Sequence, residues 1–205
     1  NSRYSTEVQE ALKKYQAKFG PRGESSMTLD QAPLNQMMGE AHVVDVRKLA
    51  GSTSESQWPA SPQITVELLK QHESTRPFRP GEVVIFQSGY SDKHFKPLPD
   101  APELDSLFAA PLAGKSEGWP AATPEAIAYL GSKGIRCVGT DGPTLGGVNK
   151  ENALMVNWLA ASQGMLTVEF LTGVGAISDK PAFFIFAPIK IKGTRGGYGR
   201  ALALY

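Results

Sequence analysis

One stretch of the sequence decides the fold: GIRCVGTDGPTLGGVNKENALMVNWLAASQGMLTVEF, residues 134–170. Its apolar run 135–139 predicts a strand, and the turn-forming residues of TDGPTLGG predict a loop after it. A helix should follow, with Asn149 or Asn152 as its N-cap. Residues 166–170 then alternate between apolar and polar side chains, which predicts a second strand.

Two polar side chains stand where this pattern requires apolar ones. Asn157 falls on the apolar stripe of the predicted helix, and Glu169 lies near the end of the second strand. A carboxylate in such a place must be paired, bind a ligand or face a cleft. Glu169 is therefore either a pocket residue, acting as a base or binding a cation or metal, or a carboxylate held by backbone amides or a lysine. Asn157 is expected to hydrogen-bond a loop or Glu169.

Other polar residues lie in loops that could bind a ligand. Thr140, Asp141 and Thr144 follow the first strand, where α/β folds place ligand groups, but they can equally cap and shape the turn. Segment 90–119 shows no regular pattern, and loops of this length are usually functional or cover other elements. Its candidate cleft residues are Tyr90, Asp92, His94 and Phe95. An Asp92–His94 pair with a water would be a general base, although this spacing is common by chance.

The composition predicts one soluble globular domain over residues 1–205. Hydrophobic residues make up 41% of the chain and charged residues 20%, which suits a single core. The 21 basic and 20 acidic residues are spread along the chain and leave a formal charge of +1, so we expect neither nucleic acid nor a membrane as partner. No apolar run approaches the ~20 residues that span a bilayer.

The sequence leaves the cellular compartment open. Cys137 is the one cysteine, and its place inside the predicted strand indicates a buried, unreactive thiol that forms no intrachain disulfide. The chain starts with Asn1 instead of Met, which indicates either a removed leader or a trimmed sequence. A secreted protein and a cytoplasmic one both fit.

The rest of the chain alternates strands and helices. Residues 6–18 predict an amphipathic surface helix, and a Thr-Pro-Glu start predicts another helix from residue 123 to 134. A short helix is expected at 64–73. Strands are expected at 42–49, 82–87, 181–191 and 200–205. This order predicts an α/β fold with a mixed sheet.

Several pieces of the sequence resemble a known family when they are taken in order. They are GWPAATPEAIAYLGSKGIRCVGTDGPTLG, GMLTVEFL, FGPRGESSMTLDQAPLNQMMGEAHVVDVR, RPGEVVIFQSGY and APIKIKGTRGGYGRALAL. Over about residues 18–205 the chain resembles the metal-dependent cyclase or kynurenine-formamidase-like hydrolases. The resemblance implies a swivelling β/β/α fold, a dimer or tetramer, and hydrolysis of amides or cyclic esters and amides with a bound divalent metal.

The chain departs from this family at the metal-binding motif. The family has HxGTHxDxPxHF, whose final Phe matches Phe19, and Lys18 stands where the last histidine belongs. We interpret residues 1–17 as a divergent helix that replaces the motif region. The family also has a histidine on the long helix and a glutamate twelve residues later; Glu169 matches, and Asn157 takes the place of the histidine.

The resemblance therefore selects two groups of residues. Glu169 and Lys18 are the candidate catalytic residues. The candidate pocket residues are Asn157, Thr140, Asp141, Phe19 and Tyr90.

A complete metal site is not expected from this chain alone. Zinc or manganese needs three or more converging His, Asp or Glu side chains. His42, His72 and His94 show no metal-ligand spacing, and we interpret each as an ordinary surface or sheet histidine. No metal cofactor is expected unless ligands for zinc or manganese come from outside the chain. The glycine-rich loops match neither a P-loop nor a dinucleotide fingerprint, and no G-x-S-x-G occurs.

Three functions remain. The first is a cyclase-family protein with a degenerate site that binds a small molecule, a homo-oligomeric partner or both. The second is an active hydrolase of an amide, ester or lactone, with its missing ligands supplied by removed or separate N-terminal sequence. The third is a metal-free enzyme that uses Glu169 as its base.

Overall fold

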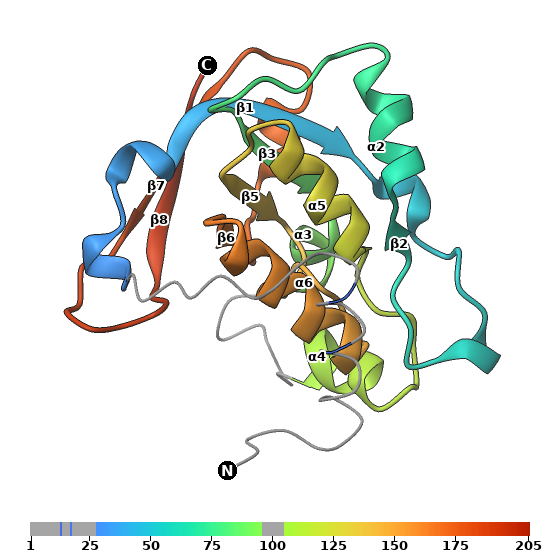
Figure 1. Ribbon diagram of the computed structural model, residues 1–205. Helices are drawn as coiled ribbons and strands as arrows, with labels where there is room; N and C mark the ends of the chain where they lie inside the picture. The colour runs from blue at the N-terminus through green and yellow to red at the C-terminus, as the bar shows by residue number, and fades with distance from the viewer. Residues whose placement is uncertain (1–12, 14–16, 18–27, 96–104) are drawn as a thin grey trace.

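A computed structural model describes residues 13, 17, 28–95 and 105–205, without the side chains of Asp105 and Ser106 (Figure 1). The predictions for Lys18, for Phe19 and for nearly all of the helix at 6–18 lie outside these residues.

A six-stranded mixed sheet forms the centre of the molecule, in the order β6-β5-β3-β1-β7-β8. Neighbours among β1, β3, β5 and β6 run parallel, whereas β7 runs antiparallel to both β1 and β8. The strands are β1 (Met38–Asp45), β3 (Val83–Gln87), β5 (Cys137–Thr140), β6 (Leu166–Val168), β7 (Phe183–Pro188) and β8 (Gly199–Leu204). The predicted α/β fold with a mixed sheet is confirmed. A second, parallel pair joins β2 (Gln63–Ile64) to β4 (Ala121–Ala122).

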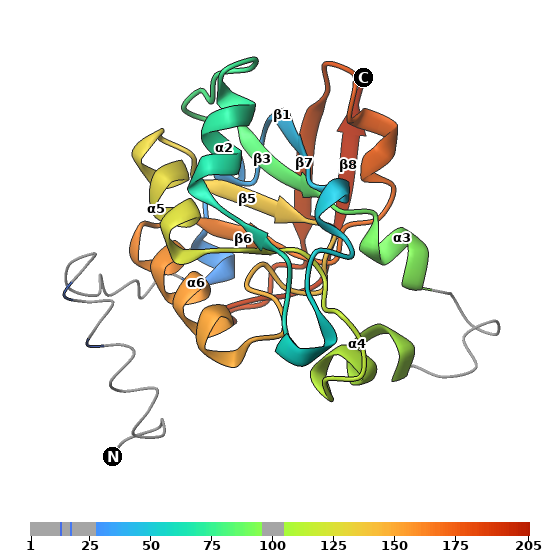
Figure 2. The same cartoon turned by 90° about the vertical axis from the view of Figure 1, so that its right-hand side faces the viewer.

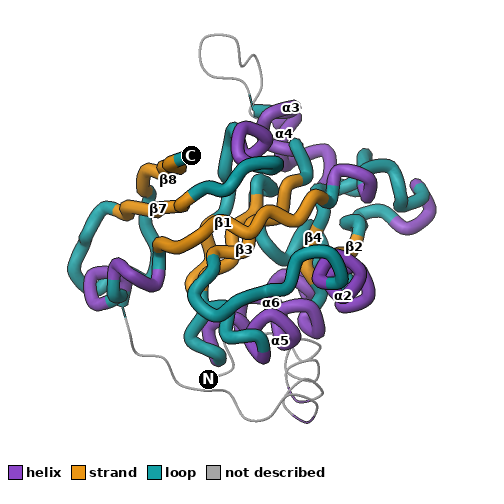
Figure 3. Tube along the Cα trace, turned by 90° about the horizontal axis from the view of Figure 1, so that it is seen from above, coloured by secondary structure: helices purple, strands orange, loops and turns teal. Residues whose placement is uncertain are grey.

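Three helices cover one face of the sheet, as Figures 1 and 2 show. They are α2 (Val66–Glu73), α5 (Pro124–Ser132) and α6 (Lys150–Ser162). Their starts follow the sequence, because the side chains of Thr65, Thr123 and Asn149 each accept a backbone hydrogen bond as N-caps. Figure 3 shows β7 and β8 at the end of the sheet away from these helices.

Alternate residues of the central strands enter two apolar cores. Val44, Val84 and Phe86 face the helices, while Val43 and Ile85 face the opposite side, where the 3₁₀ turn η5 (Val174–Ile177) covers them. Burying one such side chain stabilises the fold by about 1.5–3 kcal/mol. Cys137 lies in the second core and is buried, as predicted, and burial raises the pKa of its thiol to about 12.

The segment expected to be irregular contains two helices, α3 (Tyr90–His94) and α4 (Asp105–Leu112). The prediction was wrong because tertiary contacts hold them in place. Ser91 in α3 donates from its backbone to the carbonyl of Asp141 at 3.2 Å, and the Tyr90 hydroxyl donates to the carbonyl of Leu107 in α4 at 3.0 Å. Helices α3 and α4 are in contact, and Figure 3 shows them at the same end of the molecule. Within the described ranges, no helix has the length and apolarity needed to cross a bilayer.

Candidate functional site

The candidate site lies at the carboxyl edge of the parallel strands. Strand β3 ends at Gln87, β5 at Thr140 and β6 at Val168, so the loops that follow them meet at one edge of the sheet. Open α/β sheets place ligand groups at this edge.

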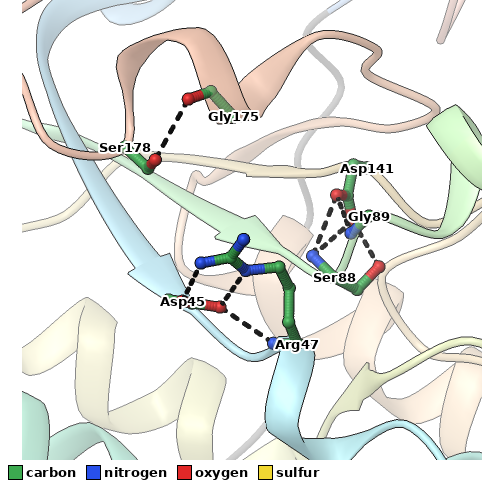
Figure 4. Close-up of polar contacts among 7 residues, drawn as sticks. All are labelled: Asp45, Arg47, Ser88, Gly89, Asp141, Gly175 and Ser178. Atoms are coloured by element: carbon green, nitrogen blue, oxygen red, sulfur yellow. Dashed lines mark hydrogen bonds and ion pairs between the residues drawn. The ribbon is translucent and has the colours of Figure 1, made fainter.

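Asp141 connects two of these loops and is completely buried. Its carboxylate accepts hydrogen bonds from the Ser88 backbone amide at 2.8 and 2.9 Å, from the Ser88 hydroxyl at 2.5 Å and from the Gly89 amide at 2.6 Å (Figure 4). Gly89 has φ +72°, which favours glycine at this turn. Burial raises the pKa of Asp141, and the hydrogen bonds from Ser88 and Gly89 oppose that rise. Asp141 therefore fixes the turn between β3 and α3, the alternative that the sequence left open.

Thr140 has a similar role in the same loop. Its side chain is buried, and its hydroxyl oxygen accepts a hydrogen bond from the Gly142 amide at 3.0 Å. Both Thr140 and Asp141 were candidate pocket residues, and their polar atoms hold the loop in shape.

Glu169 follows β6 directly and is half-buried. One carboxylate oxygen, Oε1, accepts a hydrogen bond from the Leu145 amide at 2.8 Å. Burial raises the pKa of Glu169, and this hydrogen bond opposes the rise. A carboxyl group with a raised pKa can donate or accept a proton closer to neutral pH than an exposed one. Glu169 is held by a backbone amide, and its chemistry also suits a functional role.

The residue after Glu169 has a strained backbone. Phe170 has φ +64°, the left-handed region that bulky residues rarely adopt. Its amide donates to the carbonyl of Gly142 at 2.9 Å, and the next amide, from Leu171, donates to that of Thr140 at 3.1 Å. Such a conformation costs about 1–3 kcal/mol and is found most often at functional sites. Here it turns the chain sharply beside Glu169.

Aromatic rings from four segments, that of Phe170 included, pack together in a set called here the aromatic cluster. Phe170 packs against Phe95 with centroids 5.6 Å apart and against Phe108 at 6.0 Å. Trp119 contacts Phe108 at 6.3 Å and Tyr90 at 5.6 Å. The members are Tyr90, His94, Phe95, Phe108, Trp119 and Phe170. Phe95 is 45% exposed and Phe108 is 36% exposed, although both are large and apolar.

The aromatic cluster is attached to the loop that holds Glu169. The indole N–H of Trp119 donates to the carbonyl of Thr144 at 2.8 Å, one residue before Leu145. Burial raises the pKa of Tyr90 to about 12, so its hydroxyl stays neutral. Tyr90, a predicted pocket residue, is thus part of the site region.

Asp92 and His94 use separate partners. The Asp92 carboxylate accepts a hydrogen bond from the Gly173 amide at 2.8 Å, whereas the His94 ring packs against Tyr90 with centroids 4.4 Å apart. The described hydrogen bonds include none between Asp92 and His94. Asp92 holds α3 against the loop after β6.

Asn157 lies on the exposed side of α6, so the predicted phase of this helix was wrong. Helix α6 buries the neighbouring positions Met155, Val156, Trp158, Leu159 and Ala160 instead. No hydrogen bond recorded for the described residues joins Asn157 to Glu169. The inward amide is Asn152, whose side chain donates to the carbonyls of Ala122 and Gly146, both at 2.9 Å. The apolar stripe predicted from the sequence ran through Asn157 and left out Met155 and Trp158. These two bulkier apolar residues determine which face of α6 packs inward.

A cavity of about 300 Å³ lies at the start of α6. It is lined mainly by small and amide side chains, among them Ser61, Gln63, Gly146, Asn149 and Asn152. Asn157, Thr140, Asp141 and Tyr90 are not among its lining residues, so the predicted pocket residues do not form this cavity.

The described side chains do not fit a resident divalent metal. Among them, no group of three or more His, Cys, Asp or Glu residues is placed to hold an ion. Asp141 is fully engaged by Ser88 and Gly89, and Glu169 belongs to no group of three such side chains among the described residues. His42 and His72, which show no metal-ligand spacing in the sequence, are in contact in the structure, with their Nε2 atoms 2.9 Å apart. They lie 30 residues apart in the chain, which no spacing motif reveals.

Comparison with known families now places the chain. The Cyclase family model matches residues 10–146, which is most of the chain. The chain belongs to the Cyclase family. A search of curated proteins gave no match.

Solved structures of this fold are also similar to the chain. An isatin hydrolase bound to the product analogue thioisatinate is 23% identical, with a TM-score of 0.69, over 89% of this chain and 65% of that one. Isatin hydrolase A of Labrenzia aggregata, bound to benzyl benzoate, is 22% identical, with a TM-score of 0.68, over 87% and 65%. A predicted metal-dependent hydrolase from Bacillus stearothermophilus is 22% identical, with a TM-score of 0.55, over 88% and 69%.

These similarities establish a cyclase-family hydrolase fold for the chain. The first two neighbours are longer: the chain spans about two thirds of their length, 65% in each case.

Proposed function

We propose that this cyclase-family protein binds a small aromatic amide, lactam or ester between Glu169 and the aromatic cluster, and that its hydrolytic site is degenerate. The observation that supports binding is the packing of two exposed aromatic rings on Phe170, the residue that follows the half-buried Glu169 in the chain. Binding would then occur without metal-activated hydrolysis.

The aromatic cluster provides the apolar part of the proposed site. Phe95 and Phe108 leave much of their ring surface in solvent, and exposed apolar patches of this kind often mark binding surfaces. Flat rings favour flat ligands, because offset-stacked and edge-to-face pairs gain about 0.5–1.5 kcal/mol beyond their buried area. The two isatin hydrolase neighbours were solved with thioisatinate and benzyl benzoate, and benzyl benzoate is an aromatic ester.

Glu169 provides the polar part. Its Oε1 atom is occupied by the Leu145 amide, and none of the hydrogen bonds recorded for the described residues uses Oε2. Oε2 therefore remains for a ligand. Because burial raises the pKa of this group, the carboxyl can donate to a ligand carbonyl when protonated or accept from a ligand N–H when ionised.

The degenerate part of the proposal is supported by the positions of the candidate ligands. Asn157, which the family resemblance puts in the place of a histidine, is exposed on the outer side of α6. Asp141, the other buried carboxylate at this edge, already accepts hydrogen bonds from Ser88 and Gly89. A three-residue ligand set therefore does not form within the described ranges.

Calorimetric titration with isatin and with benzyl benzoate tests the binding proposal. We expect Phe108→Ala to weaken binding of at least one probe by about twofold to twelvefold, since a lost ring pair is worth about 0.5–1.5 kcal/mol. Tyr198→Ala is the matched control, because Tyr198 is 90% exposed and outside the aromatic cluster. Equal affinities for the two variants, or no binding of either probe by the unaltered protein, would reject the proposed site.

An active hydrolase is the second candidate, and one observation favours it. About a third of each isatin hydrolase neighbour has no counterpart in this chain, so ligands for zinc or manganese could come from outside it. Elemental analysis of the purified protein, together with an assay of isatin ring opening, separates the two. Stoichiometric metal together with turnover would replace the degenerate-site proposal by the active-hydrolase one. Absence of both metal and turnover would support the degenerate-site proposal.

A further inference from the structure

A buried polar cluster lies at the opposite edge of the sheet from Glu169. His42, in the middle of β1, is fully buried, and its Nδ1 atom lies 2.7 Å from Glu82 Oε2. Its Nε2 atom lies 2.9 Å from Nε2 of His72, in the last turn of α2. Glu82 immediately precedes β3, which places these three residues, called here the histidine pair and its carboxylate, near the amino ends of the strands.

The carboxylate decides how the protons are arranged. Glu82 Oε2 also accepts a hydrogen bond from the Arg79 amide at 2.9 Å, so it acts as an acceptor and His42 donates to it from Nδ1. In a neutral His42 the Nε2 atom is then unprotonated and can only accept. His72 must therefore donate to His42 Nε2 from its own Nε2–H. The ring centroids are 5.1 Å apart, which sets the two Nε2 atoms tip to tip with space for one hydrogen.

One aromatic ring and charged side chains of both signs surround the histidine pair. Phe78 packs against His42 with centroids 4.5 Å apart and against His72 at 5.9 Å. The Arg76 guanidinium donates to the Ala41 carbonyl at 2.9 Å and opposes further positive charge on both rings. Glu82 and the more distant Glu73 favour a charged His42.

Glu73 also connects α2 to α5. It forms an ion pair with Lys133 at 2.8 Å and accepts a hydrogen bond from the Tyr129 hydroxyl. The last turn of α2 is therefore held by two contacts, one through His72 to β1 and one through Glu73 to α5. Both hydrogen-bonding partners of Glu73 lower its pKa, so this second contact persists to lower pH.

We propose that the histidine pair is an acid-operated latch: protonation of both rings breaks the His42–His72 hydrogen bond and releases the last turn of α2 from β1. A first added proton binds Nδ1 of His72, because His42 Nδ1 and His72 Nε2 already carry hydrogens, and it leaves the hydrogen bond between the two Nε2 atoms in place. A second leaves two N–H donors facing one another at hydrogen-bond distance, and two positive rings beside Arg76. No such pair can remain in contact, so His72, the less buried partner, turns toward solvent.

The direction of the pH effect follows from burial. Burial lowers the pKa of both His42 and His72 below the ordinary value of 6.5. The closed latch is thus stable above pH 6.5, and its stability is lost as the pH falls through the lowered values. In the open form the His42–His72 hydrogen bond is broken. For each proton that the open form binds beyond those bound by the closed form, the open population rises about tenfold per pH unit below 6.5.

Hydrogen exchange of the full chain tests the latch, with peptides covering residues 66–80 compared at pH 7.5 and 5.5 after correction for intrinsic exchange. In the unaltered protein, exchange of these peptides should rise about tenfold at pH 5.5. In His72→Gln, which keeps an amide that can hydrogen-bond but cannot titrate, the rise should fall below about twofold. His94→Gln is the matched control and should keep the full rise, because His94 lies in the aromatic cluster at the other edge.

The outcomes divide clearly. An equal rise in His72→Gln and the unaltered protein, or no rise in either, overturns the latch. Nitrogen NMR of the unaltered protein gives a test that needs no variant. It should show the His42 proton on Nδ1 and the His72 proton on Nε2 at pH 8, and both rings titrating below pH 6.5. A His42 proton on Nε2, or titration of both rings at 6.5, also overturns it.

Discussion

Asp141 offers the sharpest test of how the site edge is held together. Its carboxylate is buried and accepts hydrogen bonds from the backbone amides of Ser88 and Gly89 and from the Ser88 hydroxyl. In Asp141→Ala the hydroxyl can turn to solvent, but the two amides lose their acceptor. Two stranded buried donors cost about 2–6 kcal/mol together.

Removing the carboxylate offsets part of this cost. Burial raises the pKa of Asp141, which means that the folded protein carries a desolvation penalty for the ionised group. We therefore expect Asp141→Ala to lower the free energy of unfolding by about 2–4 kcal/mol at pH 7. Asp141→Asn should cost less, because one oxygen remains and Ser88 can rotate its hydroxyl to accept from the new amide.

Urea denaturation followed by circular dichroism measures these differences, and Asp45→Ala provides the control. Asp45 is likewise a hydrogen-bonded carboxylate, with Arg47 at 2.7 Å, but the side chains of Asp45 and Arg47 are 49% and 59% exposed. An exposed pair of this kind contributes at most about 1 kcal/mol. If Asp141→Ala costs no more than Asp45→Ala, the buried carboxylate does not organise the turn and the reasoning fails.

Three further predictions follow from the same contacts. Glu169→Gln should raise the free energy of unfolding at pH 7 but not at pH 4. The folded pKa of Glu169 is raised above its ordinary 4.5, so the unaltered protein loses stability as the pH rises through the raised value, whereas the glutamine variant does not. Equal differences at both pH values would contradict this. Cys137 should react with a thiol reagent at pH 8 only as fast as the protein opens, because its thiol is buried with a pKa of about 12; immediate stoichiometric labelling of the native protein would show otherwise. Asn157→His should change stability by less than about 0.5 kcal/mol and add no zinc affinity in a metal titration, because the side chain at 157 points to solvent; a new zinc site would mean that this position faces Glu169 after all.

The regular elements could be predicted because their signals are local. Thr65, Thr123 and Asn149 cap helices that begin at the next residue, since a side-chain oxygen satisfies an amide only three positions away. The continuous apolar run at 83–86 predicted a buried strand, and it forms the centre of the sheet. Helices α3 and α4 escaped prediction because contacts with distant carbonyls and rings support them.

The candidate site could be predicted only in outline. Glu169 was recognised as a carboxylate near the end of a predicted strand and as the match to the family glutamate, and the structure places it at the strand end beside the loop that the sequence marked as glycine-rich. The direction of Asn157 could not be read with certainty, since several faces of α6 carry apolar residues and packing against α5 and the sheet chose among them.

By itself, the sequence determined the α/β class, the starts of α5 and α6, the buried thiol and the membership in a family of cyclase-like hydrolases. Those properties depend on local patterns and on motifs that follow one another in order. Only the tertiary structure decided which side chains meet: Asp141 with Ser88, Phe170 with Phe108, and His42 with His72. Partners separated by tens of residues come together through the order of strands in the sheet, and a single sequence contains no local signal for that order.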